Sequence, residues 1–359
     1  MTTTPAEARL ASTLDARAYL GGFVRHPVAR AVAKAVLTVW VTTTLTFFLI
    51  RLMPGSPVEL KIDELMQQSN GALSYQEAAA AASSLFSIDL NAPLHEQYLS
   101  FTGNVLRGDL GYSFLSPGTT VASIILAVLP WTLFAVGTGL LLSFIVGIAL
   151  GLVAAYRRNS LFDRVTTTAG SLISSIPNYL LALLIVLFLG LQLRLLPITQ
   201  MRGALSPGMR PGFTPEFVGD VLFHAALPIT VFFLSHLGHW ILSMRSATLA
   251  ALEEDYVVAA RARGLSDGRI TTAYVGRNAI LPLVTQLSIA VGFVVGGAVV
   301  IEQIFVYSGV GLRLINSVNQ RDYPVIQGIL LLTTVSVVVA NLVADLLYTR
   351  LDPRIGRAG

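Results

Sequence analysis

The chain has 359 residues, of which 54% are hydrophobic and only 12% are charged, and its mean hydropathy is +0.69. This composition excludes an ordinary soluble domain and predicts an integral membrane protein. The absence of cysteine excludes a disulfide framework, a zinc–thiolate site and a thiol nucleophile. The formal net charge of +4 would suit a nucleic-acid partner, but the basic residues are distributed as membrane topology requires.

Six apolar segments are long enough to cross a bilayer, which needs roughly 20 mostly apolar residues for each helix, or fewer where flanking charged side chains extend to the surface. They cover residues 35–50, 124–155, 165–193, 221–244, 278–301 and 324–344. Pro130, Pro177 and Pro228 lie within three of them and are expected to kink or start a helix. The fold class predicted from this pattern is an all-α membrane protein with six transmembrane helices. Its expected parts are a lead-in (1–34), a first span (35–50), an extracytoplasmic subdomain (51–123), a five-span core (124–348) that includes a cytoplasmic loop (245–277), and a tail (349–359).

Basic residues gather in alternate connections between these segments. They are Arg9, Arg17, Arg25, Arg30 and Lys34 before the first span; Arg157, Arg158 and Arg164 after the second; Arg245, Arg261, Arg263, Arg269 and Arg277 after the fourth; and Arg350, Arg354 and Arg357 at the end. By the positive-inside rule, these connections and both termini are expected in the cytoplasm. The lead-in lacks an apolar core followed by a small-residue cleavage site, so it is not expected to be a cleaved signal peptide.

Two long connections are expected on the opposite side of the membrane. The first, 51–123, contains “SYQEAAAAASSLF”, whose serine start and strong helix formers predict one of two or three short helices. The second, “RLLPITQMRGALSPGMRPGFTPEFVGD”, is rich in glycine and proline and is expected to be irregular and mobile.

The most charged stretch, “EEDYVVAARARGLSDGR”, predicts a short helix, a tight turn and a second helix. Acidic residues begin it, where they suit the positive end of the helix dipole, and Gly264 stands where the first helix would end. The face shared by Tyr256, Ala259, Ala260 and Arg263 has small side chains at its middle, which suits insertion into a groove of another protein. Ser266 is a candidate N-cap for the second helix, and Leu265 and Ile270 are spaced as a hydrophobic staple. The alternative is a solvated connection between two spans.

The longer segment “EDYVVAARARGLSDGRITTAYVGRNAILPLVT” resembles the cytoplasmic EAA loop of ABC-importer permeases of the dipeptide, oligopeptide and nickel family. The matching residues are Glu254, Asp255, Tyr256, Val257, Ala260, Arg261, Ala262, Gly264, Leu265 and Ser266, then Arg277, Asn278, Ala279, Leu281 and Pro282. Arg263 stands where the family pattern has lysine, which keeps the charge. “IRLMPGSPVE”, with Ser56 in place of an aspartate, “GDLGYS”, “NQRDYPVIQG” and “DLLYTRLDPRI” resemble the family as well, so the likeness extends over about 47–355.

The resemblance implies the type I ABC importer permease fold in a bacterial plasma membrane, with dipeptides or oligopeptides as cargo. It also implies four kinds of partner: a homologous second permease, one or two cytoplasmic ABC ATPase chains, an extracytoplasmic solute-binding protein and membrane lipid. The residues expected to couple to the ATPase are Glu254, Asp255, Tyr256, Ala259, Ala260, Arg261, Arg263, Gly264 and Leu265. ATP and magnesium are expected in the ATPase, and this chain is expected to hold no catalytic group, cofactor or metal.

The residues themselves agree that ATP hydrolysis belongs to a partner chain. A phosphate-binding P-loop needs a lysine after a glycine, and the only lysines, Lys34 and Lys61, follow alanine and leucine. Import of nickel or of another small solute, such as glutathione, is the alternative within the family. An ion-coupled secondary transporter is the alternative outside it.

Several other residues suggest functions that we weighed against structural roles. His236 and His239 have a spacing that can ligate metal, but two ligands are not a site. Glu302 is expected at the outer surface, and Asp345 is expected to be satisfied locally at the inner end, which leaves little basis for a proton relay. The glycines of two small-residue stripes are expected to be packing surfaces; they are Gly147 and Gly151, and Gly292, Gly296 and Gly297.

Overall fold

The computed structural model describes residues 27–52, 57–69, 73–85, 92–116, 118–294 and 299–351. Within them the chain is almost entirely helical, and its β pairing is an isolated bridge between Tyr112 and Thr120. The helices are α2 (Pro27–Arg51), α3 (Pro57–Gln68), α4 (Tyr75–Leu85), α5 (Leu94–Leu106), α6 (Val121–Tyr156), α7 (Leu161–Ser174), α8 (Asn178–Leu184), the π-helix η1 (Ile185–Gln192), α9 (Pro215–Leu252), α10 (Asp255–Ala262), α11 (Asp267–Arg269), the π-helix η2 (Ile270–Gly276), α12 (Arg277–Ala279), α13 (Leu281–Phe293), α14 (Val299–Phe305), α15 (Val310–Asn319) and α16 (Tyr323–Leu351).

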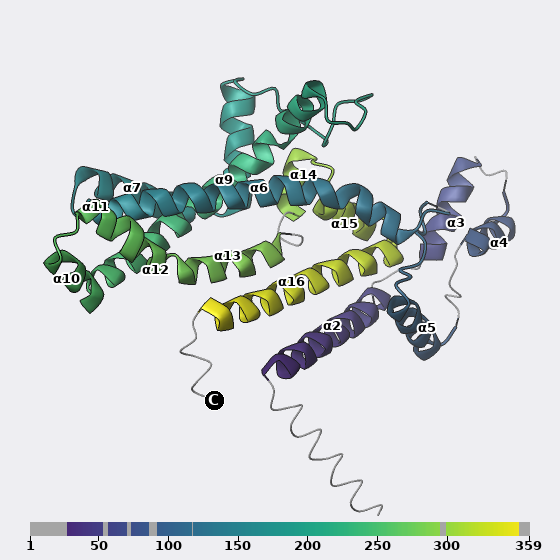
Figure 1. Cartoon of the computed structure of the whole chain (residues 1–359). Coiled ribbons are helices and arrows are strands. Elements are labelled where there is room, and N and C mark those ends of the chain that lie inside the picture. The colour runs from purple at the N-terminus through teal and green to yellow at the C-terminus, as the bar shows by residue number, and fades with distance from the viewer. Residues whose placement is uncertain are drawn as a thin grey trace, which may run out of the picture.

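Four helices in the described residues are long and apolar enough to cross a membrane, namely α2, α6, α9 and α16. Two bent pairs raise the number to six when each pair is counted as one span: α7 with α8 and η1, bent by 96°, and α14 with α15, bent by 86°. The all-α membrane fold expected from composition is therefore confirmed. Figure 1 shows α10 and α11 at one end of the long helices and α3 and α4 beyond the other.

The three prolines expected to interrupt spans behave differently. Pro177 separates α7 from α8 and begins the sharp bend between them. Pro130 and Pro228 remain inside the continuous helices α6 and α9. The predicted fifth span, 278–301, is not one helix, because Pro282 lies in the first turn of α13 and α13 ends at Phe293, while α14 begins at Val299. Gly296 and Gly297 lie outside the described residues.

Helices α6 and α9 pack against each other at the centre of the fold, where glycines of α6 allow a close approach to α9. A Cβ atom added at Gly147 would lie 2.4 Å from Cβ of Trp240, and one added at Gly151 would lie 2.5 Å from the carbonyl oxygen of Ile241. Gly139 meets Cβ of Phe232 in the same way. From this contact to that of Gly147 with Trp240, the residue number rises by eight in both helices, so α6 and α9 run parallel. Small residues allow such close crossings in membranes. The predicted packing role of Gly147 and Gly151 is confirmed, and Gly292 of α13 likewise meets Ala340 of α16.

The segment before α6 contains the short helices that the sequence predicts. Helix α4 begins after Ser74, whose backbone N–H and hydroxyl both donate to Glu77, while the Glu77 N–H donates to the Ser74 hydroxyl. This is a capping box, and it confirms the serine start. Helix α5 is joined to α2 by the hydroxyl pair of Thr44 and Tyr98 at 2.7 Å.

The glycine- and proline-rich connection between η1 and α9 is irregular, as expected, but it is anchored. Ser206 donates its backbone N–H and its hydroxyl to Asp220 of α9, at 2.8 and 2.6 Å. The N–H of Gly203 donates to the carbonyl of Val306, and Met201 is buried in the main core. These tertiary contacts are not evident from the local composition, and the expected mobility of the connection stays a prediction.

Candidate functional site

The predicted helix–turn–helix follows directly from the end of α9. Helix α10 begins after its N-cap Glu254, and Gly264 has φ +74°, a left-handed conformation that favours glycine. The N–H of Gly264 donates to the carbonyl of Arg261, and the N–H of Leu265 donates to that of Ala260. These two bonds form a Schellman motif, the expected glycine-dependent helix stop. Ser266 has the extended backbone of an N-cap before α11, although its side chain makes no capping bond.

The segment has a small hydrophobic core of its own, formed by the buried side chains of Val257, Ala260, Ile270 and Val275. Half-buried neighbours complete it; they are Ala251, Leu252, Tyr256 and Leu265. The predicted staple is supported, because Leu265 packs against the cluster that contains the buried Ile270. This core joins α10 to the end of α9 and to η2, so the segment is packed onto the fold and is not a loose connection.

The same core corrects the predicted contact face. Ala260 is only 3% exposed and packs inside this chain, so it has no surface to offer to another protein. Periodicity grouped Ala260 with Tyr256, Ala259 and Arg263, but it could not tell which side of the helix faces the rest of the fold.

The side of α10 opposite to the buried Ala260 is exposed. Glu254, Asp255, Ala259, Arg261, Arg263 and Gly264 are exposed, as are Ala262 and Val258. Val258 was not predicted, although it is 63% exposed and is the large apolar side chain of this face. The sequence feature that could have predicted its exposure is its position two residues before Ala260, which places the two residues on opposite sides of the helix. We call Asp255, Val258, Ala259, Arg261 and Ala262 the outward face.

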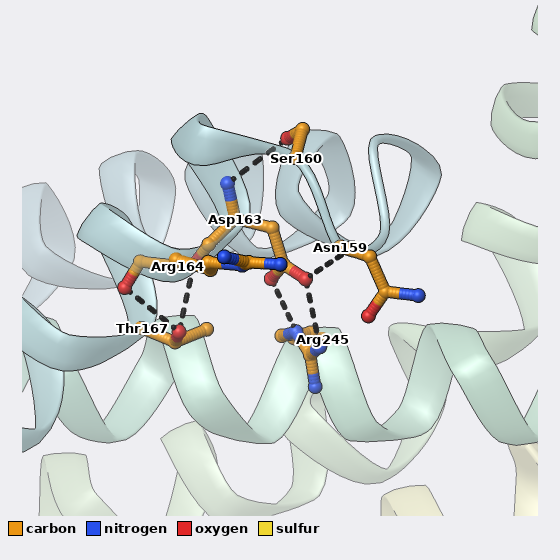
Figure 2. A network of polar contacts seen from close by, with 6 residues as sticks. All are labelled: Asn159, Ser160, Asp163, Arg164, Thr167 and Arg245. Atoms are coloured by element: carbon orange, nitrogen blue, oxygen red, sulfur yellow. Dashed lines mark hydrogen bonds and ion pairs between the residues drawn. The ribbon is translucent and has the colours of Figure 1, made fainter.

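A charged contact fixes α9 shortly before it reaches α10 (Figure 2). Arg245 donates from Nε and Nη2 to the two carboxylate oxygens of Asp163 in α7, at 2.6 and 2.9 Å. The Asp163 carboxylate also accepts the N–H of Asn159, and the Asp163 N–H donates to the Ser160 hydroxyl. A two-point arginine–carboxylate contact fixes orientation as well as distance.

This ion pair was not predicted, because Arg245 was considered only as part of the distribution of basic residues and Asp163 was not considered. The available signal was the acid Asp163 in the otherwise basic stretch “YRRNSLFDRV”. We call this side of the bundle the arginine-rich end; its residues include Arg157, Arg158, Arg164, Arg245 and Arg261.

Glu302 is buried, and the expectation that it lies at the outer surface is wrong. It is 1% exposed, and its carboxylate accepts the Thr132 hydroxyl of α6 at 2.6 Å. It also accepts the N–H groups of Gly311 and Leu312, at the start of α15. These donors and the positive end of the helix dipole suit a carboxylate. The side chain of Asp345 lies outside the described residues.

Two of the family-like stretches meet in space. The hydroxyl of Ser113, in “GDLGYS”, donates to Asp322, in “NQRDYP”, at 2.5 Å, and the N–H of Phe114 donates to the other carboxylate oxygen at 3.0 Å. Asp322 is fully buried. The stretches therefore join the chain before α6 to the start of α16, 209 residues later.

His236 and His239 do not point to a common metal. His236 pairs with the carbonyl of Phe232, and His239 pairs with the Gln286 side chain of α13. Across the described residues, no group of three or more His, Cys, Asp or Glu side chains is arranged to hold a metal ion.

Comparison with known proteins agrees with the membrane fold. Residues 147–357 match the family described as binding-protein-dependent transport system inner membrane component. The chain is 36% identical, over 87% of its length and 93% of the relative's, to a protein of Brucella suis biovar 1 named as a candidate peptide permease. It is 32% identical over the same shares to the oligopeptide transport system permease protein AppB of Bacillus subtilis.

A third relative is the di/tripeptide transport system permease protein DppB of Pseudomonas aeruginosa, with 33% identity over 91% of this chain and 98% of the relative. The family matches more than half of the chain, and these relatives match most of the remainder. A bundle of apolar helices with a packed segment beyond its central helix pair fits a membrane-embedded transport subunit. The chain therefore belongs to the family of inner membrane components of binding-protein-dependent transport systems.

Proposed function

We propose that this chain is a permease subunit of an ABC importer for dipeptides or oligopeptides, and that the outward face of α10 docks onto a cytoplasmic ATPase. The observation that carries the docking role is the arrangement of α10, which is packed onto α9 by Val257 and Ala260 while Val258 remains 63% exposed. Because α10 is fixed to α9 on one side and exposed on the other, a displacement of a bound partner can be transmitted through α10 to α9. The names of the relatives, an oligopeptide permease and a di/tripeptide permease, support peptides as cargo.

The outward face has the chemistry of a protein contact. Val258 offers an apolar anchor beside the small Ala259 and Ala262, which leave the helix backbone accessible to a close partner. Arg261 and Arg263 form no ion pair among the described residues, so their guanidinium groups are available to acids on another chain. Asp255 is placed to pair with a basic residue.

The arginine-rich end belongs in the cytoplasm under this proposal. The positive-inside rule favours it, since Arg157, Arg158 and Arg164 crowd the short connection between α6 and α7. Both termini are then cytoplasmic, and the subdomain that contains α3, α4 and α5 lies outside. There it can meet a solute-binding protein that delivers the cargo.

The ion pair of Asp163 and Arg245 connects α9, which carries the docking segment, to α7 in the helix bundle. Motion of α10 reaches α9 through the small hydrophobic core, and Arg245 passes it to α7. Closure of an ATPase dimer around ATP and magnesium would supply the motion, and a homologous permease would complete the pore. Rigid-body shifts of packed helices are an ordinary form of such transitions.

The test is the substitution Val258→Glu, with Tyr75→Glu of α4 as a control on a similarly exposed large side chain outside the candidate spans. The complex is purified through a tag on this chain in mild detergent, and the co-purified ATPase is quantified. Val258→Glu is expected to reduce ATPase recovery about ten-fold or more, because a buried unpaired charge at an interface costs roughly 2–5 kcal/mol. The control is expected to retain it.

Full ATPase recovery and normal uptake by Val258→Glu would contradict the docking assignment. A wild-type chain that purifies without any ATPase and still transports would favour an ion-coupled transporter instead. Uptake of nickel but not of peptides by the wild-type complex would leave the docking role intact and overturn the cargo.

A further inference from the structure

A polar stripe runs along one side of α9 toward the arginine-rich end. His239 and Ser246 are exposed, and Ser243 is half-buried between them. Their spacing of four and three residues places them on one helix face. Beside His239 lies Gln286 of α13, also exposed, with Oε1 3.3 Å from His239 Nε2. Gln286 has its own exposed neighbours one turn away, Pro282 and Ile289.

His239 lies within the apolar part of α9 that is long enough to cross a membrane. The parallel contacts of α6 and α9 place Ala250 level with Arg157, the first arginine after α6. His239 lies about 16 Å from that level, at a rise of 1.5 Å per residue. A bilayer core is about 30 Å thick, so a position at this distance from the arginines falls inside it.

Polar groups at this depth are unfavourable against lipid and normally face the interior of a bundle, a water-filled cavity or another protein. Other exposed faces of this chain follow that rule: α2 presents Val36, Leu37 and Leu49, and α6 presents Ile145. The side chains of His239 and Gln286 bond only to one another among the described residues, which leaves hydrogen-bonding groups on both unused. A neutral imidazole has one donor and one acceptor, and the glutamine amide has two donors and one acceptor.

We propose that His239 and Gln286 line the translocation pathway and hydrogen-bond the backbone of the passing peptide. The inference rests on the proposed function. A peptide unit offers one N–H and one C=O, which match the mixed donors and acceptors of the pair without selecting a side chain. The apolar neighbours Pro282 and Ile289 on α13 give peptide side chains a surface that holds none of them tightly.

The absence of cysteine makes a direct accessibility test possible. His239→Cys and Gln286→Cys each introduce the single thiol of the chain, as does the matched control Ile145→Cys, which is exposed on α6 at nearly the same depth. The assembled complex in proteoliposomes is treated with a membrane-impermeant, negatively charged thiol reagent. Thiols react as thiolates, which need water. Both pathway variants are expected to react at least ten-fold faster than Ile145→Cys, and saturating dipeptide is expected to slow them.

Two results would overturn the inference. If the two cysteines are as unreactive as Ile145→Cys both in the complex and in the isolated subunit, the pair faces lipid. If they react in the isolated subunit but not in the complex, the pair is covered by the second permease.

Transport kinetics give an independent measurement. His239→Ala and Gln286→Ala are each expected to raise the KM for dipeptide uptake several-fold, with normal recovery of the ATPase. Thr230→Ala is the control, because Thr230 is exposed on the opposite side of α9 and its hydroxyl donates to the carbonyl of Ala226. Unchanged KM values in both variants would refute the peptide contact. A wild-type complex that imports no peptide would instead refute the proposed cargo, while the thiol labelling still reports whether the pair faces water.

Discussion

The packing of α6 against α9 predicts that one methyl group will have opposite effects at two glycines of the same helix. Gly147→Ala places a Cβ atom 2.4 Å from Cβ of Trp240, whereas Gly137→Ala meets no atom within 4 Å. In a helix interior, alanine is favoured over glycine by roughly 0.5–1 kcal/mol. Both variants gain this contribution, so their difference isolates the steric term.

Overpacking a close contact costs typically about 1–3 kcal/mol, because the neighbouring backbone must move. A rotation of the Trp240 side chain cannot relieve the contact, since the atom that is met is Cβ itself. We therefore expect Gly137→Ala to be neutral or slightly stabilising and Gly147→Ala to be destabilising, with a difference of about 1–3 kcal/mol.

The assay is thermal unfolding of the detergent-solubilised subunit and of the assembled complex, followed by tryptophan fluorescence. Gly147→Ala is expected to lower the Tm by a few degrees relative to Gly137→Ala. Equal unfolding temperatures for the two variants would refute the close parallel contact of α6 and α9.

Three further predictions concern polar contacts. Arg245→Ala leaves the carboxylate of Asp163, which is 5% exposed, without its partner; unfolding is expected to occur at a lower temperature, and the double change with Asp163→Asn is expected to recover part of the loss. Thr132→Val removes one donor from the buried carboxylate of Glu302, so chemical denaturation is expected to show a loss of about 1–3 kcal/mol. Hydrogen bonds from the side chain and backbone of its serine cap hold the pKa of Glu77 below its ordinary value. The cap should therefore stabilise α4 above pH ~4.3 and be lost as the pH falls through the lower folded pKa; hydrogen exchange of α4 should show this loss in the wild type and not in Glu77→Gln.

Local patterns in the sequence were sufficient for several helices and some of their ends. Apolar length predicted the long helices α2, α6, α9 and α16, Ser74 marked the start of α4, and Gly264 marked the end of α10 with its positive φ. These features depend on the residue itself or on neighbours within one helical turn. A short window of sequence therefore contains all the information needed to predict them. Apolar length was misleading for the predicted fifth span, which is not one helix, and did not predict the bent pair of α14 and α15.

Contacts between distant segments could not be predicted in the same way. Arg245 and Asp163 are 82 residues apart, and Arg245 was interpreted only as one of the basic residues that indicate topology. Ala260 was assigned to the wrong side of α10 because the periodicity of a short helix does not say what packs against it. Glu302 was placed by its distance from a span end, while its burial depends on α15 folding back onto it.

Helix α9 has a mechanical consequence that follows from its length. It is a single helix of 38 residues, so it extends about 57 Å between Thr214, its N-cap, and Leu252, shortly before α10 begins. A tilt of about 5° around its arginine-rich end displaces the other end by about 5 Å, close to one helical turn. Asp220, which holds Ser206, is carried on that far end. Under the proposed function, a small angular change where α10 meets the ATPase would become, along one continuous helix, a large movement of the irregular connection between η1 and α9.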